Sequence, residues 1–388
     1  MPLPFTPGRL ARNAVNKGGP SVSRSKRISL AYPLIRKSGF DALVVAPSPD
    51  LEYLTGLAPH PGERFNGLFL MADGRSFAVV SKLYAQEYRE GLPTSAPVYE
   101  WRDEDWFFDT LSQAFADHDI GEGAVIGVND SVMAVDAVEI AQRQKVSLAN
   151  GWHTLGCLRL IKDSDEIACL KKAGEISDRA LEALLPFIKP GRTEKEIRRK
   201  LLELMEDFGA TSQAFTPIVA RGENAAMPHY AGGEGVIKEK DSVLLDFGCR
   251  YRGYFSDMTR TFFIGERPER EIEEMYQVVL RSQDKGEAAA RPGITSESLD
   301  VTARSVIEEA GYGQYFNTRL GHGIGLAIHE SPNIMRGNPQ TLAEGMTFSI
   351  EPGIYIPGRI GIRIENCVVV TTDGCEPLTR FPKELRVL

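Results

Sequence analysis

The feature that most constrains this chain is a set of apolar, strand-forming segments that end in carboxylates. Residues 243–248 read Val-Leu-Leu-Asp-Phe-Gly and place Asp246 at the end of the apolar run, and Asp257 follows eleven residues later. If the chain turns about residues 251–252, Asp246 and Asp257 lie opposite each other in an antiparallel hairpin, with Cβ atoms about 4.5–5.5 Å apart. Two carboxylates that close repel each other unless they are protonated or bind a cation.

The same arrangement recurs further along the chain. Glu351 follows the apolar segment that begins at residue 348, and Glu365 ends the segment 361–365. A hairpin centred on Gly358 would place these two glutamates opposite each other on one face. The sequence therefore predicts two hairpins, each with two acids on a shared face.

One histidine lies between the two predicted hairpins. His322 stands in the glycine-rich stretch 321–325, where the backbone can approach other groups closely. Four carboxylates and one neutral imidazole form a ligand set that suits two divalent first-row metal ions; manganese, cobalt, iron and zinc are all compatible. Two such ions about 3.5–4 Å apart can share a water molecule, lower its pKa and polarise a carbonyl group.

The first part of the chain alternates strand and helix signals, which predicts an α/β domain. A length of 388 residues corresponds to roughly two or three domains. The pattern predicts strands near residues 41–46, 66–71, 76–80 and 124–128, and helices from 23 onward, near 106–116 and near 132–142.

The second part of the chain begins with two helix-start signals. Asp163 and Glu166 have the spacing of a capping box for a long helix that runs toward Pro190, and Thr193 and Glu196 repeat that spacing. Strands, two helices near 269–290 and 296–310, and further strands follow, which predicts an α+β domain. The expected divisions are a mobile tail over 1–22, an α/β domain over 23–158 and the second domain over 159–388.

Composition excludes several classes of protein. The net charge of -8 argues against a general nucleic-acid binder. The sequence contains no run of 18 consecutive apolar residues, so we expect no membrane span. The five cysteines form no Cys-x-x-Cys pair, so neither a disulfide scaffold nor a structural zinc site is expected, and reduced thiols suit the cytoplasm. Eight basic residues and no acidic one precede Asp41; this fits a mobile tail, with an organelle transit peptide as the alternative.

At its acidic and histidine motifs the sequence resembles the pita-bread metallopeptidases, which include methionine aminopeptidase, aminopeptidase P and prolidase. The resemblance covers about residues 160–388, and the segment Glu-Tyr-Leu-Thr-Gly at 52–56 resembles the creatinase/prolidase-type N-terminal domain. It implies a pita-bread catalytic domain, hydrolysis of an amide bond with Xaa-Pro peptides as the leading substrate, two divalent metal ions with manganese first, and a homodimer.

The resemblance also implies which residues hold the metals. The family's five ligands fall on Asp246, Asp257, His322, Glu351 and Glu365. Asp257 and Glu365 would bridge the two metals. Asp246 would bind one metal, and His322 and Glu351 the other.

Further roles follow from the same resemblance. His229 and His329 match histidines that hold the scissile carbonyl oxygen or the leaving nitrogen as charge develops. Glu351 matches a glutamate that also handles the proton of the attacking water. Arg363 lies two residues before Glu365, where relatives carry an arginine that supports the bridging glutamate.

One position departs from the prolidase pattern. Many prolidases have an arginine directly after the His-Glu-x-Pro string, and that arginine binds the carboxylate of a C-terminal proline; this chain has Asn333 there. Arg336, three residues on, is the candidate substitute. The departure favours longer Xaa-Pro peptides, as in aminopeptidase P, or an amide that is not a peptide.

Two other hypotheses remain open at the level of sequence. One is an amidohydrolase that acts on a small metabolite, similar to creatinase or ectoine hydrolase. The other is a non-catalytic pita-bread scaffold that binds a partner, although such scaffolds have typically lost ligands and all five are present here.

Overall fold

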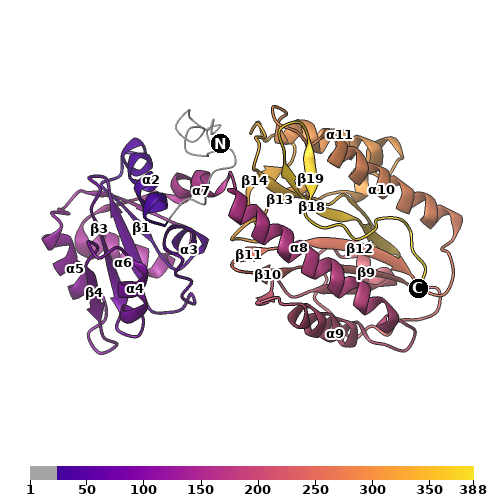
Figure 1. The fold of residues 1–388 in the computed structure, drawn as a ribbon, viewed down its shortest axis with the longest axis horizontal. Coiled ribbons are helices and arrows are strands. Elements are labelled where there is room, and N and C mark those ends of the chain that lie inside the picture. The colour runs from indigo at the N-terminus through magenta and orange to yellow at the C-terminus, as the bar shows by residue number, and fades with distance from the viewer. Residues whose placement is uncertain (1–23) are drawn as a thin grey trace. The chain divides into compact units, whose positions relative to one another are not determined.

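The computed structural model describes residues 24–388, so the predicted tail over residues 1–22 lies outside the described residues. The described chain divides into two compact units, one that ends at Arg159 and one that runs from Leu160 to Leu388 (Figure 1). The first unit is an α/β domain and the second is an α+β domain, as the sequence predicts for both units.

The first unit is built on a mixed six-stranded sheet. Its strands are β1 (Ala42–Val45), β2 (Gly67–Met71), β3 (Ser76–Ser81), β4 (Val98–Trp101), β5 (Val125–Val128) and β6 (Ser147–Asn150). Their order in the sheet is β4-β3-β2-β1-β5-β6, in which β2 runs antiparallel to both neighbours. The sequence pattern finds the four inner strands and misses β4 and β6, because these edge strands are partly exposed and have no continuous apolar run.

Helices cover both faces of this sheet. They are α2 (Arg24–Lys37), α3 (Pro49–Thr55), α4 (Ala85–Gly91), α5 (Phe108–Asp117), α6 (Ala134–Gln144) and α7 (Trp152–Arg159). Val44 packs in one cluster with Leu111 of α5 and Ile140 of α6. Its neighbours Leu43 and Val45 point to the opposite face and are also buried. Burial on both faces accounts for the unbroken apolar run of β1.

Two helices open the second unit, and each begins at a capping box that the sequence predicts. They are α8 (Ser164–Leu184), capped by Asp163, and α9 (Glu194–Asp207), capped by Thr193. The short 3₁₀ helix η1 (Leu185–Phe187) follows α8 and ends it before Pro190. Two later helices, α10 (Arg270–Ala289) and α11 (Ser296–Glu309), lie close to their predicted ranges.

The second unit is centred on an eight-stranded sheet. Its strands are β8 (Ile218–Arg221), β9 (Ser242–Phe247), β12 (Met258–Phe263), β13 (Gly321–Gly323), β14 (Glu330–Ile334), β15 (Thr347–Ile350), β18 (Glu365–Val370) and β19 (Cys375–Pro377). The main order is β14-β13-β15-β18-β12-β9-β8, and β19 pairs with β18. The remaining short elements are β7 (Ser212–Gln213), β10 (Cys249–Tyr251), β11 (Tyr254–Phe255), β16 (Gly353–Ile356), β17 (Ile360–Arg363), η2 (Gly222–Ala226) and η3 (Gly313–Tyr315).

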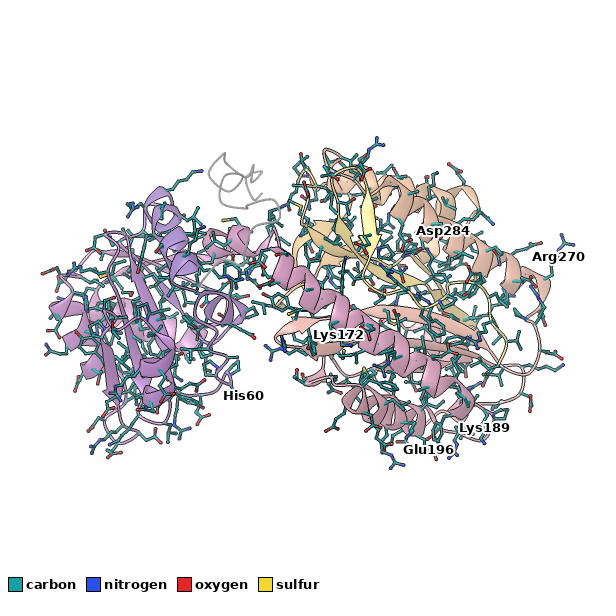
Figure 2. All side chains as sticks on the ribbon, viewed as in Figure 1. His60, Lys172, Lys189, Glu196, Arg270 and Asp284 are labelled. Carbon is teal, nitrogen blue, oxygen red and sulfur yellow. The ribbon has the colours of Figure 1, made fainter. Side chains whose placement is uncertain are left out.

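Two hydrophobic clusters fix the helices to this sheet. Residues of α8 and α9 pack with β9 and β12 in one cluster, and residues of α10 and α11 pack with β15, β17 and β18 in the other. The outer sides of the helices carry charged side chains such as Lys172 of α8, Glu196 of α9 and Asp284 of α10 (Figure 2). The helices therefore have the amphipathic pattern that their sequences predict.

The first acidic hairpin forms with a register that differs from the sequence prediction. The turn falls at Arg252–Gly253, where both residues have positive φ, and not at residues 251–252. A two-residue turn with both φ values positive favours glycine at its second position, which moves the turn one step along the chain. As a result Asp246 pairs with Thr259, and Asp257 lies two residues away from its predicted place opposite Asp246. A shift of two residues keeps both acids on one face, because side chains alternate with a period of two.

The second acidic hairpin forms in the predicted register. Ile356 pairs with Ile360 around the turn that contains Gly358, and the ladder of β16 and β17 continues to Gly353 and Arg363. The pair Ile350–Asn366 resumes the same register between β15 and β18. Glu351 and Glu365 lie between these two ladders and are therefore opposite each other.

Two further sequence expectations concern membranes and thiols. Among the helices of residues 24–388, none combines the length and the apolar character that a membrane-spanning helix needs. All five cysteines are free thiols in the structure.

A buried ion pair joins the start of α8 to β14. Lys162 Nζ lies 2.6 Å from Glu330 Oε1, and the two side chains are only 1% and 5% exposed. Substituting Lys162 by methionine leaves the Glu330 carboxylate buried without this cation. We expect Lys162→Met to lower the free energy of unfolding by about 3–5 kcal/mol, measured by urea denaturation of the metal-free protein.

The matched control for this change is Lys172→Met, within α8 itself. Lys172 pairs with Glu175 across an exposed surface, so its loss is expected to change the free energy of unfolding by less than about 0.5 kcal/mol. Equal effects of the two substitutions would show that the buried pair does not stabilise this unit.

Candidate metal centre

Three neighbouring strands bring acidic side chains to one face of the second sheet. Asp246 of β9 pairs with Thr259 of β12, and Thr259 pairs on its other side with Glu365 of β18. Directly opposed residues share a face, and Asp257 shares the face of Thr259 because it lies two residues before it. Three of the four predicted acids therefore lie side by side through the sheet ladder.

His322 joins these acids to Glu351. Its Nε2 lies 3.3 Å from Glu351 Oε1 and 3.6 Å from Asp257 Oδ2. Its Nδ1 lies 3.1 Å from the carbonyl oxygen of Gly323, so a neutral ring donates from Nδ1 and directs the Nε2 lone pair at the acids. Ligand atoms of Asp257, His322 and Glu365 all lie within 4.8 Å of one another.

The carboxylates of this cluster are buried and incompletely hydrogen-bonded. Asp246, Asp257 and Glu365 are 9%, 4% and 1% exposed, and each has one oxygen without a hydrogen-bond donor (Oδ1, Oδ1 and Oε1). A buried polar atom without a partner is costly, and a buried charge more so. Divalent cations would supply the missing partner to all three oxygens, so the donor set fits a metal centre.

Burial and mutual repulsion raise the pKa values of these acids. Burial, followed by the Glu365 charge, raises the pKa of Asp257 well above its usual range. Burial, followed by the charges of Glu351 and Asp246, does the same for the pKa of Glu365. The pKa of Glu351 rises to about 7 because burial outweighs the opposing charge of Arg363. Without a cation, the cluster therefore retains protons near neutral pH.

The histidines of the cluster are neutral. Burial, followed by the charge of His329, lowers the pKa of His322 to about 3. Burial also lowers the pKa of His329, whose ring stands perpendicular to that of His322 with centroids 4.3 Å apart. A neutral imidazole is the form that binds a metal or donates one hydrogen bond.

Arg363 contacts a different acid from the one that the resemblance implies. Its Nη2 pairs with Asp246 Oδ2, and its Nη1 donates to the Tyr355 hydroxyl over 2.7 Å. It reaches Glu365 only through Thr259, which accepts from Arg363 Nε over 3.0 Å and donates to Glu365 Oε2 over 2.7 Å. Arg363 thus orients Asp246 directly, and it orients Glu365 only through the hydroxyl group of Thr259.

Ser349, like Thr259, is a polar residue beside the acids that the sequence pattern does not identify. Its hydroxyl accepts from the backbone N–H of His322 and donates to Glu351 Oε1, both over 3.0 Å. It therefore fixes the strand that carries His322 relative to Glu351. Its only signal in the sequence is a polar residue within the buried strand β15.

His229 lies near His329 on an exposed loop. Its charge acts on the pKa of His329, and its own side chain is exposed. The buried carboxylate of Glu194 holds this loop and accepts hydrogen bonds from four donors. These are the backbone N–H groups of Arg221 and Gly235, the Asn224 amide and the Tyr230 hydroxyl. The sequence showed Glu194 only as the first residue of a helix.

The candidate substitute for the prolidase arginine lies elsewhere. Arg336 is exposed and pairs with Glu308 of α11 over 2.8 Å, so it does not replace the arginine missing at Asn333. Arg319 donates instead to Asn333, from Nη1 to Oδ1 over 2.6 Å.

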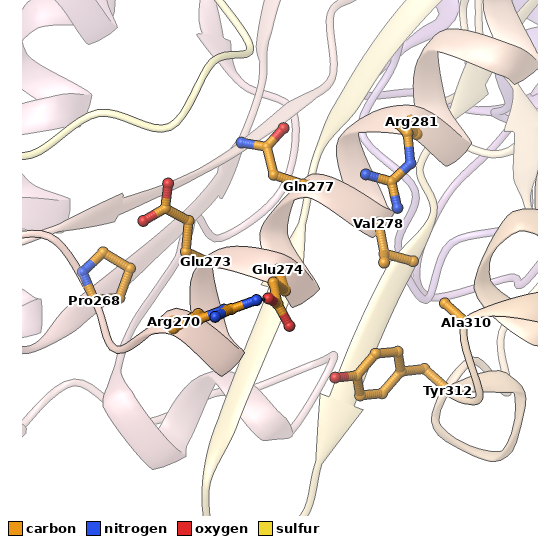
Figure 3. Close-up of a pocket in the computed structure, with 9 residues that line it drawn as sticks. All are labelled: Pro268, Arg270, Glu273, Glu274, Gln277, Val278, Arg281, Ala310 and Tyr312. Atoms are coloured by element: carbon orange, nitrogen blue, oxygen red, sulfur yellow. Dashed lines mark hydrogen bonds and ion pairs between the residues drawn. The ribbon is translucent and has the colours of Figure 1, made fainter.

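A surface hollow of about 840 Å³ lies apart from the acid cluster. It follows the outer side of α10 and the segment after α11, and its walls include Arg270, Glu274, Arg281 and Tyr312 (Figure 3). Its lining contains none of the predicted site residues, and it brings charged groups of both signs together.

Family models match both parts of the chain. The model "Metallopeptidase family M24" matches residues 168–372, and "Creatinase/Prolidase N-terminal domain" matches residues 27–160. The matched regions include all five predicted ligands and both predicted site histidines.

Similar proteins match nearly the whole chain. A protein of Mycobacterium tuberculosis named probable dipeptidase PepE is 37% identical over 94% of this chain and 96% of its own. The Xaa-Pro dipeptidase of Pyrococcus horikoshii is 33% identical over 93% and 99%. The crystal structure of a prolidase from Thermococcus sibiricus superposes with a TM-score of 0.89 at 34% identity, over 95% of this chain and all of that one.

The raised pKa values predict that cation binding releases protons. A divalent cation needs ionised carboxylates, so its apparent affinity should rise with pH, by about tenfold per unit for each proton displaced. Calorimetric titration of manganese in two buffers with different ionisation heats counts the protons released.

Thermal stability should follow the same linkage. The Glu351 carboxyl has a pKa of about 7 in the folded chain against an ordinary value of 4.5, so the metal-free protein should lose stability as pH rises through that window. Manganese removes this penalty, and the difference in Tm between metal-loaded and metal-free protein should widen from pH 5 to pH 8. A constant difference would contradict proton displacement by the cation.

Proposed function

The chain belongs to metallopeptidase family M24, and from that membership we propose that it is an Xaa-Pro peptidase whose second unit binds two divalent metal ions. The observation that carries the metal centre is the group of three buried carboxylate oxygens without donors, beside the neutral ring of His322. The names of the Pyrococcus and Thermococcus relatives support the substrate class.

The proposed ligands are the five residues of the cluster. Ligand atoms of Asp257 and Glu365 lie within 4.8 Å of each other and of His322, so these two acids would be shared by both ions. Asp246 would hold one ion, and His322 and Glu351 would hold the other. Bound divalent ions lower the pKa of a water molecule and polarise the scissile carbonyl.

Glu351 is the proposed proton carrier. It is the most exposed of the acids in contact with His322, with 20% of its side chain accessible against 6% for Asp257. In this proposal it accepts a proton from the attacking water and delivers it to the leaving nitrogen of proline. Ser349 fixes its carboxylate for this transfer.

His329 and His229 are the proposed donors to the substrate. The lowered pKa of His329 keeps its ring neutral at pH 7, so one N–H remains to donate to the scissile carbonyl oxygen as negative charge develops. His229 lies on the loop held by Glu194 and approaches from the exposed side.

The two other sequence-based hypotheses receive no support from the site. A non-catalytic scaffold gives no reason for three buried carboxylate oxygens without donors. A small-metabolite amidohydrolase requires no different set of residues, but the relatives reported above are named as peptidases. We further propose manganese as the resident metal, a homodimer as the assembly and the cytoplasm as the location.

Replacing one proposed bridging ligand should abolish activity. Asp257→Asn substitutes a neutral amide, which is a poor bridging ligand, and we expect the metal content to fall below the roughly two ions per chain of the parent. Elemental analysis and hydrolysis of Ala-Pro measure both effects. Asp207→Asn, at an exposed position on α9, is the matched control. Full activity of rigorously metal-free parent protein would refute the metal-dependent mechanism.

Replacing the proposed proton carrier should lower kcat more than it raises KM. Loss of general acid–base catalysis typically costs about 10²–10⁴-fold, and Glu351→Gln should exceed this range because ligation suffers too. Glu309→Gln, on the exposed side of α11, serves as the control. A Glu351→Gln variant within tenfold of the parent would remove Glu351 from the mechanism.

A further inference from the structure

The guanidinium of Arg319 is held beside the cluster of acids and histidines. Arg319 lies two residues before β13, and its Nη1 donates to Oδ1 of Asn333 over 2.6 Å. Asn333 is the direct antiparallel partner of His322, so their side chains share one face with Cβ atoms about 4.5–5.5 Å apart. The Asn333 amide therefore holds Arg319 on the face from which His322 reaches the acids.

The strand pairing places Arg319 beside the histidines of the centre. Asn333, which accepts the hydrogen bond from Arg319, pairs with His322 across β13 and β14. His329 directly precedes β14. The guanidinium therefore lies next to both strand segments that carry these histidines.

Arg319 also retains unused donors. In residues 24–388 its guanidinium has the one hydrogen bond to Asn333 and no carboxylate partner. By contrast, Arg363 pairs with Asp246 and Arg336 pairs with Glu308. A guanidinium carries five N–H donors in a planar fork that matches a carboxylate. Arg319 is thus a half-buried cation whose other N–H groups remain for an anionic partner.

We propose that Arg319, positioned by Asn333, determines specificity by binding the free C-terminal carboxylate of an Xaa-Pro dipeptide. The proposal rests on the proposed peptidase function and names its substrate class. In a dipeptide, the carboxylate carbon is three covalent bonds from the scissile carbonyl carbon, which limits their separation to about 4 Å. A group that binds this carboxylate must therefore lie beside the residues that act on the carbonyl, as Arg319 does.

This assignment reverses the expectation drawn from Asn333. The asparagine does not mark a missing cation; it accepts the hydrogen bond that places one. Dipeptides, whose proline carries a carboxylate, should therefore be better substrates than peptides whose proline is amidated or extended. An aspartate at the Xaa position also carries a carboxylate three covalent bonds from the scissile carbonyl carbon. The test distinguishes this side-chain carboxylate from the C-terminal one.

The test compares the manganese-loaded parent with Arg319→Gln on Ala-Pro, Ala-Pro-NH₂ and Asp-Pro-NH₂. We expect the ratio of kcat/KM for Ala-Pro to that for Ala-Pro-NH₂ to fall roughly ten- to a hundredfold in Arg319→Gln, mainly through KM. Arg319→Lys should recover part of the ratio, and Arg336→Gln should keep the ratio of the parent. A merely structural role would slow both substrates equally. An unchanged ratio, or a loss confined to Asp-Pro-NH₂, would overturn the proposal.

A binding measurement separates this inference from the peptidase function. Calorimetry of the same manganese-loaded proteins with L-proline and with prolinamide should show that the parent prefers proline and that Arg319→Gln loses the preference. If the parent hydrolyses none of the three peptides, the proposed function fails, and the proline preference still decides the role of Arg319. Equal binding of proline and prolinamide by the parent would overturn that role.

Discussion

Mutual repulsion among four clustered carboxylates, three of them buried, governs the second unit of this protein. Three of these carboxylates have an oxygen without a donor, and burial raises the pKa values of Asp257 and Glu365 well above the ordinary range. Burying these charges side by side destabilises the folded sheet unless the carboxylates stay protonated or bind cations. The surrounding polar contacts orient the acids without neutralising them all: Arg363 pairs with one carboxylate, and Thr259 and Ser349 each donate to another. The remaining charge is what divalent cations would balance.

The fold places these carboxylates at the centre of a sheet, where the strands hold them rigidly. β9, β12 and β18 are neighbours in the ladder, and helices α8 to α11 pack against the strands through two hydrophobic clusters. The proposed donors to the substrate, by contrast, lie at the edge of the centre: His329 directly before β14, and His229 on a loop held by Glu194. Rigid strands thus hold the charged groups, while a loop and a strand end carry the groups proposed to meet the peptide.

Much of this could be predicted from the sequence, because strand pairing is local in both acidic hairpins. The register around Gly358 was predicted correctly, and that around Gly253 was wrong by two residues, because the left-handed turn conformation begins at Arg252. The acids nevertheless share a face in both cases, since an even shift preserves it. Contacts between distant segments could not be predicted in this way. Arg319 and Asn333 meet only because β13 pairs with β14, whereas Arg336, which proximity in sequence suggested, pairs with Glu308.

We propose that the carboxylate cluster and His322 bind two divalent ions, with Asp257 and Glu365 shared between them. The decisive experiment is anomalous diffraction at the manganese absorption edge, from crystals of the protein loaded with manganese. We expect two anomalous peaks about 3.5–4 Å apart, with Asp257 and Glu365 each in contact with both and His322 Nε2 in contact with one. A single peak, or peaks that Asp257 and Glu365 do not share, would contradict it.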